Sequence, residues 1–262
     1  MTGQRVFITG ASSGIGSALA RYYARQGAML GLAARRGDQL SALAAELSAE
    51  FSNTSAASVH TYPLDVTDAD ALQAAGDDFL ARGGAPDIVV ACAGVSIGTL
   101  TECREDLAVI RRILDINVYG LAATFSPFIP SMRQRGKGRL VGIASVAGIR
   151  GLPGAEAYSA SKAAAIAYLE SLRVEFFGSG VKVVTIAPGY IATPMTAHNP
   201  YPMPFMLSAD EAARRFARAI ERGASYTVIP WQMGLVAKGL RLLPNWLYDR
   251  LFARAPHKPR LL

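Results

Sequence analysis

Short apolar segments alternate with longer segments of helical periodicity along most of this chain. The apolar segments are rich in Val, Ile, Leu and Ala, so we expect each of them to form a strand. The expected strands are Arg5–Thr9, Ala28–Ala34, Val59–Leu64, Ile88–Ala91, Leu140–Ala144, Val181–Ala187 and Tyr226–Ile229. Strands with little polar alternation are typical of a parallel sheet that helices cover on both faces.

The segments between these strands carry apolar residues at helical spacing. We expect helices at Gly16–Gln26, Gly37–Phe51, Asp68–Arg82, Glu105–Arg135, Ala157–Phe177 and Ser208–Arg222. Ser208, followed by Glu211, predicts a capping box at the start of the last of these helices. The alternation predicts an α/β fold in which a doubly wound parallel sheet of about seven strands forms one domain.

The composition indicates a globular protein from a reducing compartment. Of 262 residues, 51% are apolar and 18% are charged, which excludes intrinsic disorder. The two cysteines, Cys92 and Cys103, are too few for a disulfide framework. The three histidines, His60, His198 and His257, form no cluster at metal-ligand spacing. We therefore expect a cytoplasmic protein that holds no metal.

The apolar stretches of the chain indicate neither a signal peptide nor a membrane-spanning segment. Residues 1–7 lack the cationic start and long apolar run of a signal peptide. The longest uncharged stretch, Val183–Leu207, is interrupted by five prolines and is not expected to cross a membrane. We predict neither secretion nor a transmembrane segment.

A glycine-rich segment follows the first expected strand and opens the first expected helix. It has the sequence Thr9-Gly10-Ala11-Ser12-Ser13-Gly14-Ile15-Gly16. Glycine allows a tight turn and a close approach of the backbone to a pyrophosphate, and the start of a helix directs free N–H groups at phosphate charge. Glycine also serves turns that merely close, and the spacing differs from G-x-G-x-x-G, so this segment alone does not establish a dinucleotide site.

Tyr158 and Lys162 are one helical turn apart on an expected helix, and Ser145 stands thirteen residues before Tyr158 at the end of a strand. A phenol that exchanges protons near neutral pH needs its pKa lowered by about 2–3 units, roughly 3–4 kcal/mol. An ammonium at about 4 Å supplies that much at an effective dielectric near 20. Ser145 can then hydrogen-bond a substrate oxygen. Taken alone, Tyr-x-x-x-Lys is more often an ordinary exposed helix pair.

Several single residues extend these two segments into one longer pattern. The full set is Thr9–Gly16, Asp65, Ala93, Gly94, Asn117, Ser145, Tyr158, Lys162, Pro188 and Gly189. In order and spacing, over about residues 4–230, it resembles the classical short-chain dehydrogenase/reductase family. The resemblance implies a Rossmann-type domain that binds a nicotinamide dinucleotide.

The resemblance also implies a role for each catalytic candidate. Tyr158 would be the catalytic acid and base, and Ser145 would position the substrate carbonyl or hydroxyl. Lys162 would bind the nicotinamide ribose and lower the pKa of Tyr158. Asn117 would hold a water in a proton relay, with a surface or cap residue as the ordinary alternative.

Other residues match cofactor positions of the family. Asp65 corresponds to a residue that contacts the adenine, and Thr193 to one that touches the nicotinamide carboxamide. The expected cofactor residues are Gly10, Ser12, Ser13, Gly14, Ile15, Gly16, Arg35, Arg36, Asp65, Val66, Ala93, Gly94, Tyr158, Lys162, Pro188, Gly189, Ile191 and Thr193. The alternatives are a turn or cap role for Asp65 and a loop cap for Thr193.

One position departs from the family pattern. The family commonly has Asn-Ala-Gly where this chain has Cys92-Ala93-Gly94. The asparagine in relatives ties the central strands together, so we expect its replacement to affect local hydrogen bonding rather than hydride chemistry. Free cysteine is among the most buried residue types, and we expect Cys92 to be buried and unreactive.

The cofactor preference depends on the end of the second expected strand. An acidic residue there would accept from the ribose 2′-hydroxyl of NAD, whereas an arginine would accommodate the 2′-phosphate of NADP. Arg35 and Arg36 stand at this place and favour NADP, although one of them alone could be a solvated loop cation. Asp38 falls slightly late and is expected to cap the next helix.

The substrate and the partners are less determined. The segment Ile191–Leu207 occupies the place of the family's variable substrate loop, and its apolar composition favours a hydrophobic ketone or alcohol, although a loop packed over the core would look the same.

The resemblance implies a homodimer or homotetramer through Glu105–Arg135 and Ala157–Phe177. A non-catalytic dinucleotide sensor or scaffold is the alternative function, but it would typically lack Tyr158 or Lys162. The pI of about 9.6 suggests nucleic-acid binding as another possible function. However, the sequence has no nucleic-acid recognition motif and no strand face on which basic and aromatic residues alternate, so we expect no nucleic-acid partner.

The chain beyond the last expected strand is basic and amphipathic. From Val228 onward, six Lys or Arg stand against Asp249 alone, so this end carries +5 of the formal charge of +7. We divide the chain into a Rossmann-type domain, 1–230, and a basic amphipathic extension, 231–262. We expect the extension to close the substrate pocket or to pack in a subunit interface, and peripheral contact with an anionic membrane is the less favoured alternative.

Overall fold

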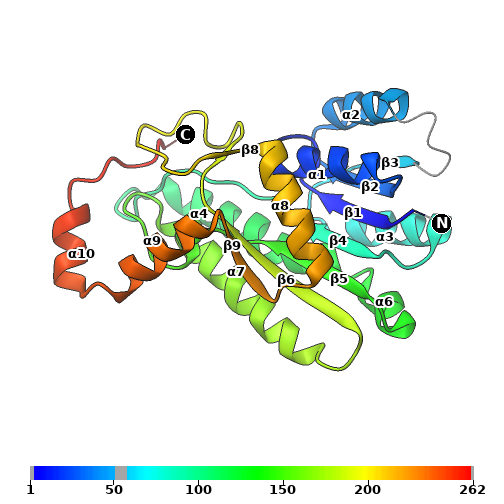
Figure 1. The fold of residues 1–262 in the computed structure, drawn as a ribbon. Helices are drawn as coiled ribbons and strands as arrows, with labels where there is room; N and C mark the ends of the chain where they lie inside the picture. Colours follow the sequence, from blue (N-terminus) through cyan, green and yellow to red (C-terminus); the bar gives the residue numbers. More distant parts are fainter. Residues whose placement is uncertain (1–2, 51–57, 261–262) are drawn as a thin grey trace.

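The computed structural model describes residues 3–50 and 58–260. Within them, seven strands form one parallel sheet in the order β3-β2-β1-β4-β5-β6-β9, which confirms the predicted doubly wound fold (Figure 1). The strands are β1 (Arg5–Thr9), β2 (Met29–Ala34), β3 (Val59–Pro63), β4 (Ile88–Ala91), β5 (Gly138–Ile143), β6 (Val181–Pro188) and β9 (Tyr226–Ile229). The strand order reverses between β1 and β4, the place where such folds bind ligands.

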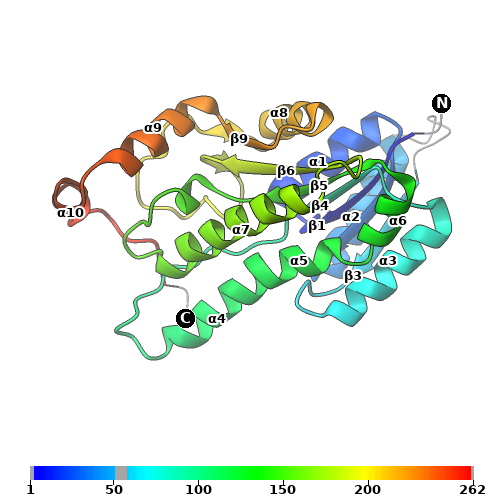
Figure 2. The same ribbon diagram turned by 90° about the horizontal axis from the view of Figure 1, so that it is seen from below.

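Helices cover both faces of the sheet (Figures 1 and 2). One face packs against α1 (Gly14–Arg25), α2 (Gly37–Glu50) and α8 (Ala209–Arg222). The other packs against α3 (Ala69–Gly83), α5 (Gly120–Phe125) and α7 (Glu156–Glu175). Successive strand residues point to opposite faces, so that Val6 and Ile8 lie in the first core and Phe7 in the second. Both faces are buried, which explains why the strands are apolar throughout.

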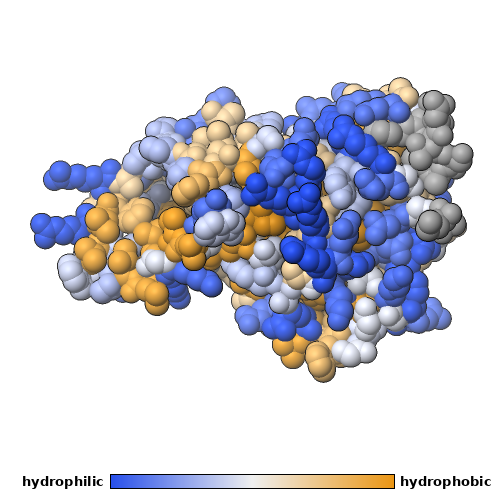
Figure 3. All heavy atoms as spheres, in the orientation of Figure 1, coloured by the Kyte–Doolittle hydropathy of each residue, from blue (hydrophilic) through white to orange (hydrophobic). Residues whose placement is uncertain are grey.

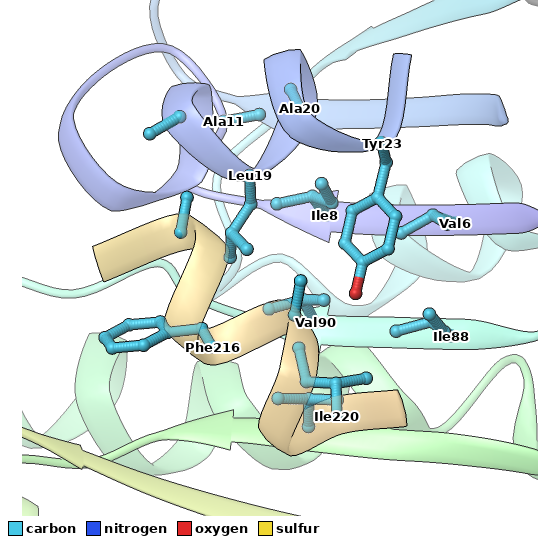
Figure 4. Packing of buried hydrophobic residues seen from close by; sticks show 14 of the residues in the cluster. Val6, Ile8, Ala11, Leu19, Ala20, Tyr23, Ile88, Val90, Phe216 and Ile220 are labelled. Atoms are coloured by element: carbon cyan, nitrogen blue, oxygen red, sulfur yellow. The ribbon is translucent and has the colours of Figure 1, made fainter. Parts of the chain in front are cut away.

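The first core holds the helix that follows the glycine-rich segment. Leu19 and Tyr23 of α1 lie between Ile8 and Val90 of the sheet and Phe216 of α8, as Figure 4 shows. All five side chains are fully buried. Packing between α1, α8 and the sheet therefore sets where α1 begins.

The expected helix Glu105–Arg135 is wrong as a single element. The chain forms α4 (Asp106–Leu114), a π-helical turn η1 (Asp115–Tyr119), α5, and after a turn α6 (Ile129–Arg135). Pro127 lies in the turn and cannot donate a backbone hydrogen bond, so the helix stops there, while Pro130 is tolerated in the first turn of α6. The other expected elements begin and end within two residues of the observed bounds, with Phe51 outside the described residues.

Only one of the two hydrogen bonds of the predicted capping box is formed at the start of α8. The Ser208 hydroxyl accepts a hydrogen bond from the Glu211 N–H at 3.2 Å. The Glu211 carboxylate accepts instead from the guanidinium of Arg215, at 2.6 Å, and from that of Arg214. Two cations one turn away outcompete a single backbone N–H for this carboxylate.

The last part of the chain forms two helices that extend past the sheet and a segment that returns to it. Figure 1 shows α9 (Trp231–Leu242) and α10 (Asn245–Phe252) at one end of the molecule and the chain after them turning back toward the loop after β6. The Tyr248 hydroxyl donates to the Gly151 carbonyl at 2.6 Å, and the Arg150 guanidinium lies 4.1 Å from the centre of the Tyr248 ring. Among the described residues, no helix has the length and apolarity needed to cross a membrane.

Removing a buried leucine from α1 should destabilise the protein much more than removing an exposed one. Leu19 is 0% exposed and Leu251 of α10 is 60% exposed. We expect Leu19→Ala to lower the free energy of unfolding by about 2–5 kcal/mol and Leu251→Ala to change it by less than about 0.5 kcal/mol. Reversible urea denaturation measures both, and equal losses would contradict the described packing of α1.

Candidate active site

The glycine-rich turn brings two backbone segments into close contact. Gly10 has φ +69°, and a Cβ atom there would lie 2.7 Å from the Cα of Ala93 in the segment after β4. A Cβ atom at Gly16 would lie 2.3 Å from the carbonyl oxygen of Gly10. Any side chain at these two positions would push the start of α1 away from β1 and β4. The glycines therefore hold the start of α1 at the carboxyl edge of the sheet.

The start of α1 offers unsatisfied N–H groups to the cleft. Ser13 is the N-cap residue, and its side chain makes no capping hydrogen bond. Its hydroxyl and that of Ser12 accept instead from the Arg36 guanidinium, at 2.6 Å and 2.9 Å. Free helix N–H groups beside a guanidinium fit the phosphates of a dinucleotide, because both favour negative charge.

Arg35 and Asp65 lie beside the same turn. An Arg35 guanidinium nitrogen lies 3.8 Å from a carboxylate oxygen of Asp65. The other Asp65 oxygen accepts from the N–H and the hydroxyl of Thr67, each at 3.0 Å, so Asp65 also has the turn role that we considered as its alternative. Asp38 does not cap α2, because that helix already begins at Gly37 and Asp38 lies in its first turn.

One cleft at the carboxyl ends of the central strands collects nearly all of the expected site residues. It has a cavity volume of about 240 Å³. The expected residues that line it are Gly10, Ser12, Ser13, Gly14, Ile15, Gly16, Arg35, Arg36, Asp65, Val66, Ala93, Gly94, Ser145, Tyr158, Lys162, Pro188, Gly189, Ile191 and Thr193. Asn117 is expected in the site but does not line the cleft.

The cleft also contains residues that the motifs did not identify. They are Ala34, Leu64, Cys92, Val95, Ile116, Ile143, Ala144, Pro194, Met195 and Thr196. Half of them, Ala34, Leu64, Cys92, Ile143 and Ala144, end or directly follow a strand of the sheet, so the rule that ligands bind beyond the carboxyl ends of parallel strands could have located these five.

Tyr158 and Lys162 both face the cleft but do not bond to each other. The Lys162 ammonium donates to the Ile143 carbonyl at 2.8 Å, and its nitrogen lies 5.9 Å from the centre of the Tyr158 ring. The lysine side chain is only 6% exposed. The end of β5 therefore holds the lysine.

Burial dominates the proton equilibria of this pair. Burial raises the pKa of the Tyr158 phenol, and a hydrogen bond with Ser145 opposes the rise by lowering it. Burial lowers the pKa of Lys162 to about 8. The predicted depression of the Tyr158 pKa by Lys162 is not found in this geometry, because the ammonium is directed at a backbone carbonyl.

Ser145 is positioned by the short helix that follows it. It is the N-cap of the 3₁₀ turn η2 (Val146–Gly148), and its hydroxyl oxygen accepts from the Ala147 N–H at 3.2 Å. Its extended backbone, with φ −168° and ψ 155°, continues the direction of β5. The cap fixes the hydroxyl beside Tyr158, where it can also donate.

Asn117 lies in the π-helical turn η1 behind the cleft. Its amide nitrogen donates to the Val95 carbonyl at 2.9 Å and to the Ser161 hydroxyl at 3.0 Å, and its amide oxygen accepts from the Val95 N–H at 2.9 Å. Both amide hydrogens are used in these bonds. The side chain thus ties the segment after β4 to α7, and the relay water stays a prediction.

Cys92 and Thr193 both line the cleft. Cys92 is half-buried rather than fully buried, and burial raises the pKa of its thiol to about 12, so it is a neutral group on the cleft wall. The Thr193 methyl lies 3.2 Å from where a Cβ of Gly14 would be, so the loop after β6 rests on the glycine-rich turn. The Thr193 N–H donates to the Thr196 hydroxyl at 3.1 Å, a local loop bond.

One residue near Tyr158 was missed entirely. The Lys258 ammonium lies 5.7 Å from the centre of the Tyr158 ring. In the sequence it is one cation among several in a basic tail, with no motif around it. Only the path of the chain brings it to the site.

Known proteins are similar to this chain in sequence and in fold. The chain matches the short chain dehydrogenase family over residues 4–202. It is 42% identical over 249 residues to an uncharacterized oxidoreductase of Myxococcus xanthus, covering 95% of this chain and 96% of that protein.

Two solved structures are similar at the level of the whole fold. The L-sorbose reductase of Gluconobacter frateurii, complexed with NADPH and L-sorbose, superposes with a TM-score of 0.76 at 25% identity over 87% of this chain and 95% of that one. A 3-oxoacyl-[acyl-carrier protein] reductase of Brucella melitensis with bound NAD gives 0.75 at 28% identity over 87% and 90%. The chain therefore belongs to the short-chain dehydrogenase/reductase family of oxidoreductases.

Proposed function

We propose that this protein is an NADP(H)-dependent reductase that interconverts a carbonyl and a secondary alcohol on a largely apolar substrate. The observation that carries the proposal is the convergence of Ser145, Tyr158 and Lys162 on the cleft that the glycine-rich turn forms. A non-catalytic sensor of dinucleotides would need none of these three side chains. Their presence together in one cleft favours the enzyme.

The chain's own residues supply the proton chemistry. A bound nicotinamide supplies or accepts the hydride. Tyr158 donates its phenolic proton to the carbonyl oxygen during reduction and takes it back during oxidation. Ser145 donates a hydrogen bond to the same oxygen and holds it within reach of the phenol. Lys162, which lies 5.9 Å from the centre of the Tyr158 ring and is mainly protonated at pH 7, would bind the nicotinamide ribose.

The preference for NADP rests on the two arginines at the end of β2. Both are exposed at the mouth of the cleft, and Arg36 is directed at the serines of the glycine-rich turn. The similar structures hold NADPH in one case and NAD in the other, so the family alone does not decide the cofactor. A 2′-phosphate would give these guanidinium groups a doubly charged partner.

The substrate side is formed by the loop after β6. It exposes Met195, Phe205 and Met206, and the rings of Tyr190 and Tyr201 lie 6.3 Å apart within the same region. These side chains suit an apolar body. They are the reason to propose a hydrophobic carbonyl compound rather than a sugar.

The proposal includes an oligomer and a membrane-facing surface. Leu107, Tyr119, Val174 and Phe177 are exposed on α4, η1 and the end of α7, and they support a homodimer or homotetramer through these helices. A different apolar face, which we call the α9–α10 face, consists of Trp231, Leu235, Leu242, Trp246 and Leu251. Figure 3 shows orange side chains gathered over α9 and α10.

Charge favours a lipid surface over a second copy of the chain as the partner of the α9–α10 face. Exposed cations around it are Lys238, Arg241, Arg250 and Arg254, against Asp249 alone. Two such surfaces would repel each other, whereas anionic lipid attracts each cation by about 1 kcal/mol. The enzyme is thus proposed to be cytoplasmic with peripheral membrane contact.

Replacing Tyr158 by Phe should remove catalysis and leave cofactor binding intact. The ring stays and only the transferable proton is lost, so kcat should fall by about 10²–10⁴. Steady-state NADPH oxidation with a reducible ketone measures kcat, and calorimetric titration with NADPH measures binding. Turnover close to that of the wild type would refute the assignment.

Replacing Arg35 and Arg36 together by Ala should weaken NADPH binding far more than NADH binding. Each lost charged hydrogen bond to a phosphate is worth about 1.5–3 kcal/mol. Titration of both cofactors into wild type and variant gives the four dissociation constants. Arg25→Ala, on an exposed guanidinium at the far end of α1, is the matched control. Equal losses for the two cofactors would contradict the NADP preference.

Acidic residues on the two exposed faces should separate membrane contact from oligomerisation. Leu235→Glu combined with Trp246→Glu should abolish salt-sensitive co-sedimentation with anionic vesicles and keep the oligomer mass. Leu107→Glu on α4 should lower the oligomer mass and keep vesicle binding. Sedimentation velocity and vesicle pelleting report both properties. The membrane proposal would be contradicted if the wild-type protein failed to co-sediment with anionic vesicles.

A further inference from the structure

The segment after α10 lies across the substrate side of the active site. The Gly98 N–H donates to the Pro259 carbonyl at 3.0 Å, in the loop between β4 and α4. A Cβ atom at Gly98 would lie 2.1 Å from the Lys258 carbonyl oxygen, and one at Gly154 would lie 2.7 Å from the Cβ of His257. Close backbone contact at both points fixes the path of residues 257–259.

An ion pair between the half-buried Arg260 and the buried Asp106 holds this segment after Lys258. The Arg260 guanidinium donates to the two carboxylate oxygens of Asp106, at 2.9 Å and 3.2 Å, and to Glu105 at 3.0 Å. Asp106 is 1% exposed and also accepts from the Leu100 N–H at 2.7 Å, and the bond from Arg260 holds the pKa of this carboxyl below its usual range. On the other side, Tyr248 ties α10 to Gly151. Lys258 is therefore held between two anchors.

Lys258 points inward and lacks a charged partner. Its ammonium donates to the Ser96 hydroxyl at 2.7 Å and lies 5.7 Å from the centre of the Tyr158 ring. Within residues 3–50 and 58–260, no carboxylate lies at ion-pair distance from it, whereas Arg260 has two. Ser96 uses one of the three ammonium hydrogens, so two remain for a ligand.

An unpaired cation in such a place is costly. Burial lowers the pKa of Lys258 to about 8, and the group is still mainly protonated at pH 7. A bound anion would compensate the lost hydration of the ammonium. Glu105 and Asp106, two acidic residues that contact this segment, already accept hydrogen bonds from Arg260. None of the carboxylates in the described residues forms an ion pair with Lys258, and an anionic ligand would supply the compensating charge.

We propose that Lys258 binds a carboxylate of the substrate, so that the enzyme acts on an apolar keto acid or on the corresponding hydroxy acid. The proposal rests on the proposed function, because it assumes that the reacting carbonyl lies at Tyr158. The carboxylate and the reacting carbon are then separated by a few bonds. Lys258 determines specificity, and Tyr158 and Ser145 carry the chemistry.

The test compares keto acids with their methyl esters. Each pair has the same apolar body and differs in one charge, so it isolates the contribution of the ammonium. For Lys258→Met we expect the KM of the acids to rise about 10- to 100-fold, kcat to stay within about threefold, and the KM of the esters to change by less than threefold. Lys258→Arg should recover most of the affinity for the acids.

Two further variants make the outcomes distinct. Arg254→Met removes an exposed cation of the same segment and should leave both substrate classes unchanged. Calorimetric titration of the keto acids into the enzyme loaded with NADP⁺, which cannot reduce them, should give binding in the wild type and in Tyr158→Phe, and at least tenfold weaker binding in Lys258→Met.

The results that overturn the two proposals differ. Equal losses for acids and esters in Lys258→Met, or a wild type that reduces esters and neither binds nor reduces acids, would overturn the role of Lys258 and leave the reductase intact. Full activity of Tyr158→Phe on both classes would overturn the proposed reaction itself, while binding of the acids would still report on Lys258.

Discussion

The close approach of the Gly10 turn to the segment after β4 is the contact on which the site depends. The space at Gly10 and Gly16 is too small for any Cβ atom, so the backbone of β1, the start of α1 and the Ala93 segment meet directly. Packing of α1 between the sheet and α8 keeps that contact closed. The cleft exists because these two constraints act on the same helix from its start and from its side.

The reactive end of the cleft is built by β5 and α7 together. β5 supplies the Ile143 carbonyl that holds Lys162, and the cap after it orients Ser145. Asn117 connects α7 with the segment after β4 through Ser161 and Val95. Each polar side chain in this region has a backbone or hydroxyl partner that sets its direction. Burial raises the pKa of Tyr158 and lowers that of Lys162 to about 8, because a buried site disfavours the charged form of each group.

Residues 231–260 have a buried inner side and an exposed outer side. Their inner side packs through Met233, Ala237 and Tyr248 and delivers Lys258 to the active site. Their outer side keeps tryptophan and leucine side chains in water among cations. A membrane contact of this tail would suit an enzyme that acts on the amphipathic substrate we propose. Both proposals therefore follow from one feature, a basic tail whose apolar residues are divided between the two sides.

Periodicity and short motifs by themselves determined the strands, most helices, the glycine-rich turn and the Tyr158–Lys162 pair, because each depends on residues within one or two turns of the chain. The π-helical turn at Asn117 and the break at Pro127 were missed, since the apolar spacing continues through both. Tertiary structure alone decided that Lys162 donates a hydrogen bond to a carbonyl of β5 and that the Asn117 amide bonds to Val95 and Ser161. It also decided that Lys258 lies beside the Tyr158 ring. These contacts join residues 19 to 100 positions apart, and their partners are mostly backbone groups or common side chains with no local pattern. Only the path of the folded chain brings such groups together.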